Sequence, residues 1–412
     1  MLISPKPIAV ASIVTLCVVE LVGRTQSSTA SWPQWRGPTR DGVAQLAIPP
    51  TWPSTLTKRW EVTVGAGHAS PVVAAGRVLV HSRQGDREVT RAFDLTSGKE
   101  LWRNEYAAPY TMNPAARAHG PGPKSTPVVS GNRVFTFGIS GILSAYDVAS
   151  GRVLWRTDAP PAPPEFGTAM SPIVVDSSVI VHLGAHDSGA LTAFDEATGK
   201  PRWRWTGDGP AYASPIVANI GGVSQLVTQS ENAVIGIGAK DGQLLWRIPF
   251  KTSYDQNSIT PVVVNDLVVY SGLSSGTTAI RVTRKSSTWT TEPLWKNDQI
   301  AMYMSTPVAT GGTLFGLSHH SRGQFFALDL ATGKTLWTTP GREGENASVM
   351  LAKELLLLST TSAELIVART SRTKFDEVKR YTIADSAVWA HLAIAGRAIL
   401  VKDVEKLICW EV

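Results

Sequence analysis

The sequence reads AFDLTSGKELW from residue 92 to residue 102, and this stretch decides the fold because the chain repeats it. Close copies are AYDVASGRVLW at 145–155, AFDEATGKPRW at 193–203 and ALDLATGKTLW at 327–337, and a weaker copy is GIGAKDGQLLW at 236–246. In the first sequence and its three close copies we expect the Asp and the Ser or Thr to hydrogen-bond the backbone of a turn in which the Gly takes the positive φ. The Trp four residues after the Gly then lies on an outer strand and faces the next repeat.

A Ser-Pro or Thr-Pro step precedes each repeat and opens a run of alternating β-branched residues. The six prolines are Pro71, Pro127, Pro172, Pro215, Pro261 and Pro307, so successive steps lie 43 to 56 residues apart. Proline is tolerated at the first residue of an inner strand, where its missing N–H costs no ladder hydrogen bond. A period of about 45 residues, with four short strands in each unit, is typical of the blades of a β-propeller.

The sequence near the two ends of the chain indicates how many blades there are. Degenerate units begin near residues 348 and 389, and the last one stops after three strands. Residues 58–62, KRWEV, have the form of a fourth strand without a blade of its own. We therefore predict an all-β fold: an eight-bladed β-propeller of four-stranded antiparallel blades, closed by this N-terminal strand pairing with the C-terminal blade. Such closure also removes exposed sheet edges. The predicted units start near residues 70, 126, 171, 214, 260, 306, 348 and 389.

The composition excludes several classes of protein. Of the 412 residues 43% are hydrophobic and 17% charged, which excludes a disordered chain or a coiled coil. The net charge of +6 is scattered along the chain, so no nucleic-acid partner is expected. Two cysteines, Cys17 and Cys409, form no disulfide framework, zinc pair or haem motif. No nucleotide-binding motif and no common hydrolase motif occurs.

An N-terminal export signal is indicated by the apolar residues 8–19 and by small residues ahead of a cut after Ala30. The apolar stretch is shorter than the ~20 residues that span a bilayer, and no later stretch is long enough. Leu16 precedes Cys17 where a lipoprotein signal has a small residue, so we expect no lipid anchor. The sequence thus predicts an exported protein of the periplasm or extracellular space, with no membrane span after the signal is removed.

The pattern Ala-x-Asp-x-x-Thr-Gly-Lys-x-x-Trp resembles the tryptophan-docking motif of quinoprotein-type (PQQ-like) propellers. That family includes the pyrroloquinoline-quinone (PQQ) alcohol dehydrogenases and the non-catalytic outer-membrane assembly-factor propeller, to which the chain is closest in type. The resemblance covers residues 58–412, which follow a predicted signal peptide at 1–30 and a strap at 31–57 that packs through Trp32, Trp35 and Trp52. It implies that blades dock through Trp60, Trp102, Trp155, Trp203, Trp246, Trp295 and Trp337.

The resemblance leaves two functions open, a binding scaffold and a divergent PQQ-dependent dehydrogenase. The dehydrogenases hold their quinone against a disulfide between adjacent cysteines and beside a calcium ion. This chain has no adjacent cysteines, and no pattern unites its candidate calcium ligands Asp255, Asn257, Glu345 and Asn346. We therefore expect no catalytic residue, no metal and no cofactor, with PQQ and calcium as the alternative. The histidine groups His182/His186/Asp187 and His319-His320 are interpreted as solvated loop residues.

We expect a partner to bind on one face of the ring. This face carries the loops that join the fourth strand of one blade to the first strand of the next, and also the loops that join the second strand of a blade to its third. Residues just before each Ser/Thr-Pro step lie at a central funnel there. They are His68, His119, Lys124, Tyr212, Tyr254, Asn257, Tyr303, Asn346, Trp389 and His391. Such groups suit an envelope protein or peptide, or a small polar ligand. Two alternatives are that these residues plug the channel, and that the aromatic ones bind carbohydrate.

Overall fold

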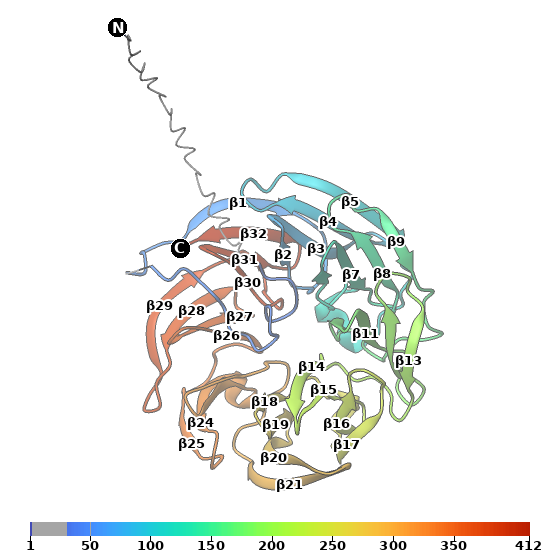
Figure 1. Cartoon of the computed structure of the whole chain (residues 1–412). Helices are drawn as coiled ribbons and strands as arrows, with labels where there is room; N and C mark the ends of the chain where they lie inside the picture. Colours follow the sequence, from blue (N-terminus) through green and yellow to red (C-terminus); the bar gives the residue numbers. More distant parts are fainter. Residues whose placement is uncertain (2–30, 50) are drawn as a thin grey trace.

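The computed structural model describes Met1, residues 31–49 and residues 51–412, so the predicted signal peptide lies outside the described residues. Thirty-two strands form eight four-stranded antiparallel sheets arranged in a ring around a central channel (Figure 1). This confirms the predicted eight-bladed propeller. Within the described part of the chain, no helix has the length and apolar character needed to cross a membrane.

The first four blades follow one another along the chain from the second strand. They are β2 (Val72–Ala74), β3 (Arg77–Gln84), β4 (Arg87–Asp94) and β5 (Glu100–Ala107); β6 (Val128–Ser130), β7 (Arg133–Phe137), β8 (Leu143–Asp147) and β9 (Val153–Arg156); β10 (Ile173–Val175), β11 (Ser178–Leu183), β12 (Ala190–Asp195) and β13 (Pro201–Trp205); β14 (Ile216–Ile220), β15 (Val223–Gln229), β16 (Ala233–Gly238) and β17 (Leu244–Pro249). In these blades the first strand is the innermost and begins directly after the Ser/Thr-Pro step, as predicted.

The remaining blades have the same order, except that the last takes its outer strand from the N-terminus. They are β18 (Val262–Val264), β19 (Leu267–Gly272), β20 (Gly276–Lys285) and β21 (Thr288–Asn297); β22 (Val308–Thr310), β23 (Thr313–Ser318), β24 (Gln324–Asp329) and β25 (Thr335–Thr338); β26 (Ala347–Ala352), β27 (Leu355–Thr360), β28 (Glu364–Arg369) and β29 (Asp376–Thr382); β30 (Ala393–Ala395), β31 (Ala398–Lys402), β32 (Lys406–Glu411) and β1 (Thr57–Thr63).

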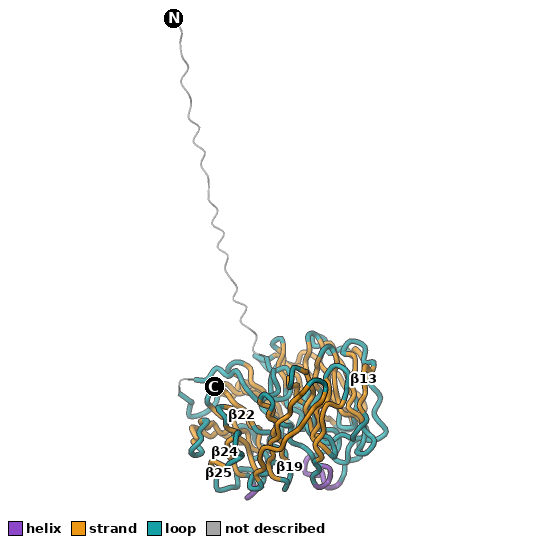
Figure 2. Tube along the Cα trace, turned by 60° about the horizontal axis from the view of Figure 1, so that its bottom comes forward, coloured by secondary structure: helices purple, strands orange, loops and turns teal. Residues whose placement is uncertain are grey.

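Three short 3₁₀ helices lie in loops of one face of the ring. They are η1 (Pro114–His119), η2 (Ser253–Asp255) and η3 (His320–Arg322). The first two lie between the outer strand of one blade and the inner strand of the next, and the third joins β23 to β24. Figure 2 shows the helical segments, in purple, on the same side of the flattened ring. This side is therefore the loop face on which the funnel was predicted.

The ring is closed by its two ends, as the sequence predicts. Strand β1 pairs antiparallel with β32, from Thr57 opposite Glu411 to Thr63 opposite Lys406. The buried ammonium of Lys402 in the same blade donates to the carbonyl oxygens of Gly67 at 3.0 Å, Asp403 at 2.7 Å and Val404 at 3.0 Å. Because Gly67 precedes the first blade, Lys402 ties the last blade to the first.

Neighbouring blades dock through an indole ring that lies on a glycine. The indole N–H of Trp102 in the first blade donates to the carbonyl oxygen of Val148 in the second, at 2.9 Å. Its ring covers Gly151, where a Cβ atom would lie 2.4 Å from the indole. The same seat joins Trp60 to Gly98, Trp155 to Gly199, Trp203 to Gly242 and Trp295 to Gly333. The repeat glycine is thus needed for close approach as well as for its positive φ of 71° at Gly151.

Two predicted docking residues have other partners. Trp337 donates to the carbonyl oxygen of Ser371 at 2.8 Å, in the degenerate seventh blade. Trp246 instead donates to Gln225 of its own blade at 2.5 Å, and its ring lies over Gly236, which stands where the close copies of the repeat have alanine. The following blade lacks the repeat glycine in its β20–β21 hairpin, so this indole has no glycine of the next blade to pack against. Trp246 therefore packs between the fourth and fifth blades without the docking bond.

The strap, residues 31–57 without residue 50, crosses one end of the central channel. Its backbone bonds Val73, Val129 and Leu351, which lie on inner strands of three blades. The buried Arg36 donates to the carbonyl oxygens of Thr306 and Pro307 at 2.8 and 2.7 Å. From the same loop Arg40 donates to Pro172 and Ser171 at 2.8 and 3.1 Å, on the opposite side of the ring. The strap is therefore held across this end of the channel by its backbone bonds to inner strands and by arginine bonds to the carbonyl oxygens of two Ser/Thr-Pro steps.

Candidate binding funnel

A ring of hydroxyl groups positions the loops around the channel. The backbone N–H groups of Ser70, Thr126, Ser171 and Thr260 donate to the hydroxyl oxygens of the next blade's step, Thr126, Ser171, Ser214 and Thr306, at 2.9 to 3.3 Å. These are the Ser and Thr residues that precede the prolines. They link the first blade to the second, the second to the third, the third to the fourth and the fifth to the sixth, and so they hold the residues just before them around one mouth.

The mouth is a cavity of about 440 Å³, and nine of the ten predicted funnel side chains line it. They are His68, His119, Lys124, Tyr212, Tyr254, Tyr303, Asn346, Trp389 and His391. Trp35 of the strap also lines the cavity, together with hydroxyl-bearing residues such as Ser70 and Thr306. The position of the Ser/Thr-Pro steps therefore predicts which loops surround the cavity. It did not predict that Trp35 of the strap also lines the cavity.

Asn257, the tenth residue, does not line the cavity. It is fully buried, and its amide nitrogen donates to the carbonyl oxygens of Ser230, Glu231 and Phe250 at 2.8 to 3.1 Å. Its own oxygen accepts from the backbone N–H of Thr252 at 3.2 Å. Asn257 thus holds two loops of the fourth blade together, because a buried amide must satisfy its hydrogen-bonding groups.

One wall of the cavity is an aromatic and imidazole cluster. The rings of His119 and Trp389 meet edge to face with centroids 4.5 Å apart, and His68 lies 6.0 Å from each. Burial lowers the pKa of His68 to about 3, so this imidazole is neutral at physiological pH. Among the described residues neither ring nitrogen of His68 has a hydrogen-bond partner of good geometry. The wall thus contains a neutral imidazole whose two ring nitrogens are buried and unpaired among the described residues.

One lysine carries a positive charge in the lining of the cavity. Lys124 is the charged side chain in the lining that the described residues provide, and its ammonium donates to the carbonyl oxygen of Phe166 at 2.7 Å. Burial lowers the pKa of Lys124 to about 8, so the group is mostly protonated at pH 7. Below the cavity, the guanidinium groups of Arg36 and Arg40 lie 5.5 and 5.4 Å from the ring centre of Trp35. An acidic group of a ligand is therefore favoured beside Lys124, whereas the carboxylates of Glu231 and Asp255 lie at the rim beside His186.

The quinone and calcium of the dehydrogenases do not fit these residues. Cys409 is a buried residue of β32 and no part of the funnel lining. Of the predicted calcium ligands, Asn257 is committed to loop contacts and the side-chain oxygen of Asn346 accepts from the hydroxyl of Ser305. The carboxylate of Asp255 pairs with Lys251 at 2.7 Å. The six to eight converging oxygens that calcium requires are therefore not assembled here.

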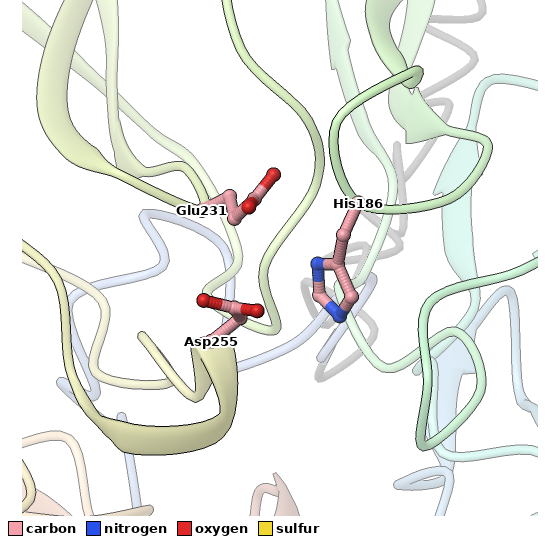
Figure 3. A group of neighbouring side chains, drawn as sticks. All are labelled: His186, Glu231 and Asp255. Carbon is pink, nitrogen blue, oxygen red and sulfur yellow. The ribbon is translucent and has the colours of Figure 1, made fainter.

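The histidines that were interpreted as solvated loop residues have different environments in the structure. His182 is buried and bonds the carbonyl oxygen of Asp208 at 3.0 Å, so its solvated interpretation is wrong. The rings of His319 and His320, in and beside η3, lie with centroids 4.5 Å apart and are tilted by 33°. His186, in contrast, lies beside Glu231 and Asp255, with one potential ligand atom of each residue within 4.8 Å of the others (Figure 3). The sequence prediction did not include Glu231.

The location of these three residues explains why Glu231 was missed and how it could have been found. His186 lies in the β11–β12 loop, Glu231 in the β15–β16 turn and Asp255 in η2. All are loops of the funnel face, and they belong to the neighbouring third and fourth blades. Comparing equivalent loops of adjacent blades would have brought His186 and Glu231 together.

The ring, the docked indoles and the funnel define an eight-bladed propeller of the PQQ-like repeat class. Within this class the chain belongs to the family described as outer membrane protein assembly factor BamB, whose model matches residues 85–339. It is similar to the BamB of Yersinia pestis, with 26% identity over 302 residues that cover 68% of this chain and 70% of that protein.

Solved structures show the same fold with two different activities in their names. BamB from Moraxella catarrhalis superposes with a TM-score of 0.62 at 13% identity, covering 87% of this chain and 98% of that one. Quinohemoprotein alcohol dehydrogenase from Comamonas testosteroni superposes with a TM-score of 0.63 at 12% identity, covering 93% and 80%. At these identities the likeness concerns the fold alone, so the fold does not separate a binding propeller from an enzyme.

Proposed function

We propose that this chain is an exported, non-catalytic propeller whose funnel binds an exposed segment of an envelope protein. Its family and its sequence relative carry the name of an outer-membrane assembly factor, which supports a scaffold role among such proteins. The observation that carries the proposal is the funnel itself, a cavity of about 440 Å³ with aromatic and imidazole walls and a floor closed by the strap.

The chemistry of the funnel selects the kind of segment. Lys124 provides a positive charge, and the neutral His68 adds a ring to the lining of the cavity. Trp389 and the tyrosines offer flat apolar faces. A peptide with an acidic group next to an aromatic or apolar residue satisfies all three features. Since the hydroxyl ring fixes the loops in advance, little conformational entropy is lost when such a segment binds.

The proposal is tested by site-specific photo-crosslinking in the native envelope. A photoreactive amino acid replaces Tyr303 at the funnel and, as a control, Lys296 on the outer strand β21, whose side chain is 56% exposed. We expect the Tyr303 position to crosslink one or a few envelope proteins and the Lys296 position to give none of these products. Equal products at both positions, or none at Tyr303, would contradict binding in the funnel.

Direct binding is measured with synthetic peptides. An acidic-aromatic peptide should quench tryptophan fluorescence in a saturable way, and Lys124→Met should weaken its binding, whereas Lys296→Met should not. The alternative function, a divergent PQQ-dependent dehydrogenase, is tested by adding PQQ and calcium and following dye reduction with alcohols. Turnover in that assay would overturn the scaffold proposal.

A further inference from the structure

Three side chains that can ligate a metal converge at the rim of the funnel. They come from three loops of two adjacent blades, and Figure 3 shows one ring nitrogen of His186 facing the carboxylates of Glu231 and Asp255. Glu231 is almost fully buried, with 2% of its side chain exposed, whereas Asp255 has 25% exposed. A buried carboxylate needs a positive partner, because its desolvation is otherwise unfavourable.

The hydrogen bonds around the group leave one ligand atom of His186 and one of Glu231 facing the centre. Nε2 of His186 lies 3.3 Å from the hydroxyl of Tyr212, which orients the imidazole. Within the described structure Nδ1 of His186 is buried without a partner. One oxygen of Glu231 accepts from the backbone N–H of Asp187 at 2.7 Å, and this bond leaves the other oxygen for a cation. Such fixing of ligands by outer partners is usual in metal sites.

The cation now beside the two carboxylates is an exposed lysine. The ammonium of Lys251 lies 2.7 Å from Asp255 and 3.6 Å from Glu231, and 53% of its side chain is exposed. Lys251 makes no contact with Nδ1 of His186 that would satisfy it. The lysine thus neutralises the carboxylates but leaves the imidazole unused, and its long side chain is free to turn into solvent.

We propose that His186, Glu231 and Asp255 bind a divalent transition-metal ion of the zinc or manganese type, which displaces Lys251. One imidazole with two carboxylates is a donor set that these ions accept, whereas calcium prefers a larger set of oxygens. Ligand atoms around zinc at ~2.0–2.1 Å lie roughly 3.3 Å apart. The present separations of up to 4.8 Å would therefore have to shorten by up to about 1.5 Å when the metal binds.

The metal would stiffen the funnel wall. Tyr212, which bonds His186, and Tyr254, which precedes Asp255, both line the cavity. Three protein ligands also leave a fourth position on the metal for water or for a donor from a bound segment. The site is thus an independent cation site next to the funnel, and it exists whether or not the funnel binds an envelope protein.

The test is a Zn²⁺ titration of the purified protein in competition with a chromophoric chelator. We expect saturable binding of one equivalent. The His186→Ala variant should bind at least roughly tenfold more weakly, since even outer partners of a ligand are worth about 10–100-fold in affinity. Lys251→Met should bind more tightly, because the competing ammonium is gone. Replacing Zn²⁺ with Co²⁺ should give visible absorption bands that His186→Ala loses.

The control is the pair His319→Ala and His320→Ala, which removes the neighbouring histidines of the sixth blade and should leave the affinity unchanged. If His186→Ala fails to fold, Glu231→Gln replaces it, because the amide oxygen retains the bond to Asp187. Unchanged Zn²⁺ affinity in the His186 or Glu231 variant would overturn the proposal. So would loss of binding in the His319/His320 variant, or no saturable binding by either the wild type or Lys251→Met.

Discussion

The docking of indole on glycine can be tested by placing a single methyl group under Trp102. In Gly151→Ala the new Cβ would lie 2.4 Å from the indole, at a backbone φ of 71°. The matched control is Gly131→Ala in the same blade, which has φ 55° and no atom within 4 Å of the new Cβ. Both variants carry the left-handed strain of alanine, but only the first displaces the tryptophan.

The expected magnitudes follow from these two terms. Left-handed strain costs roughly 1–2 kcal/mol for a residue with a Cβ. Overpacking of a closely packed site adds typically about 1–3 kcal/mol. We therefore expect Gly131→Ala to lower the free energy of unfolding by about 1–2 kcal/mol and Gly151→Ala by about 2–5 kcal/mol.

The assay is urea unfolding followed by far-UV circular dichroism, with variants compared at a constant m-value. A double-mutant cycle with Trp102→Ala isolates the contact. Without the indole, Gly151→Ala should cost no more than Gly131→Ala does. The reasoning is refuted if the two glycine variants are equally stable in the wild-type background, or if the extra cost of Gly151→Ala persists after Trp102 is removed.

Three further predictions concern charged groups. Binding of an acidic peptide should weaken about tenfold from pH 7 to pH 9, because the pKa of Lys124 is lowered to about 8 and its protonated fraction falls from about 0.9 to about 0.1. The affinity of Lys124→Met for the same peptide should not change over this pH range. The same pH dependence in this variant and in the wild type would show that Lys124 is not the group responsible. Lys402→Met should lower the free energy of unfolding by about 1–3 kcal/mol, since it leaves buried carbonyl groups unpaired. Urea unfolding measures this change, and the surface variant Lys406→Met should lower the free energy of unfolding by less. Arg36→Met should release the strap and speed proteolysis within residues 31–57; cleavage at the wild-type rate would show that Arg36 does not brace the strap.

The blades and their closure could be predicted because they rest on local, repeated patterns. Each repeat carries its own turn, proline step and strand alternation, and the unpaired KRWEV segment matches the missing outer strand. The funnel residues were found for the same reason, since the proline step fixes where each inner strand begins. Trp246 departed from the pattern because its blade has Gly236 in place of alanine and the next blade lacks a glycine seat.

The contacts that the sequence did not predict join residues far apart in the chain. Arg36 meets Thr306 across 270 residues, and no periodicity marks that pairing. The hydroxyl ring was missed for a related reason: Ser and Thr before proline were noted as part of a step, but the partner of each hydroxyl lies in the next blade. Glu231 is a single acidic residue in a tight turn, and nothing in its local sequence marks it as a candidate ligand. It becomes one only because the neighbouring blade places His186 beside it.

The shared eighth blade has a consequence for how the protein is made. Along the chain, β1 is the first of the described strands and its partner β32 is the last of them. Strand β1 therefore lacks its partner until the strands of the seven other sheets have been synthesised. A truncated product that lacks β32 would leave both β1 and the edge of β31 unpaired, and such exposed strand edges favour aggregation.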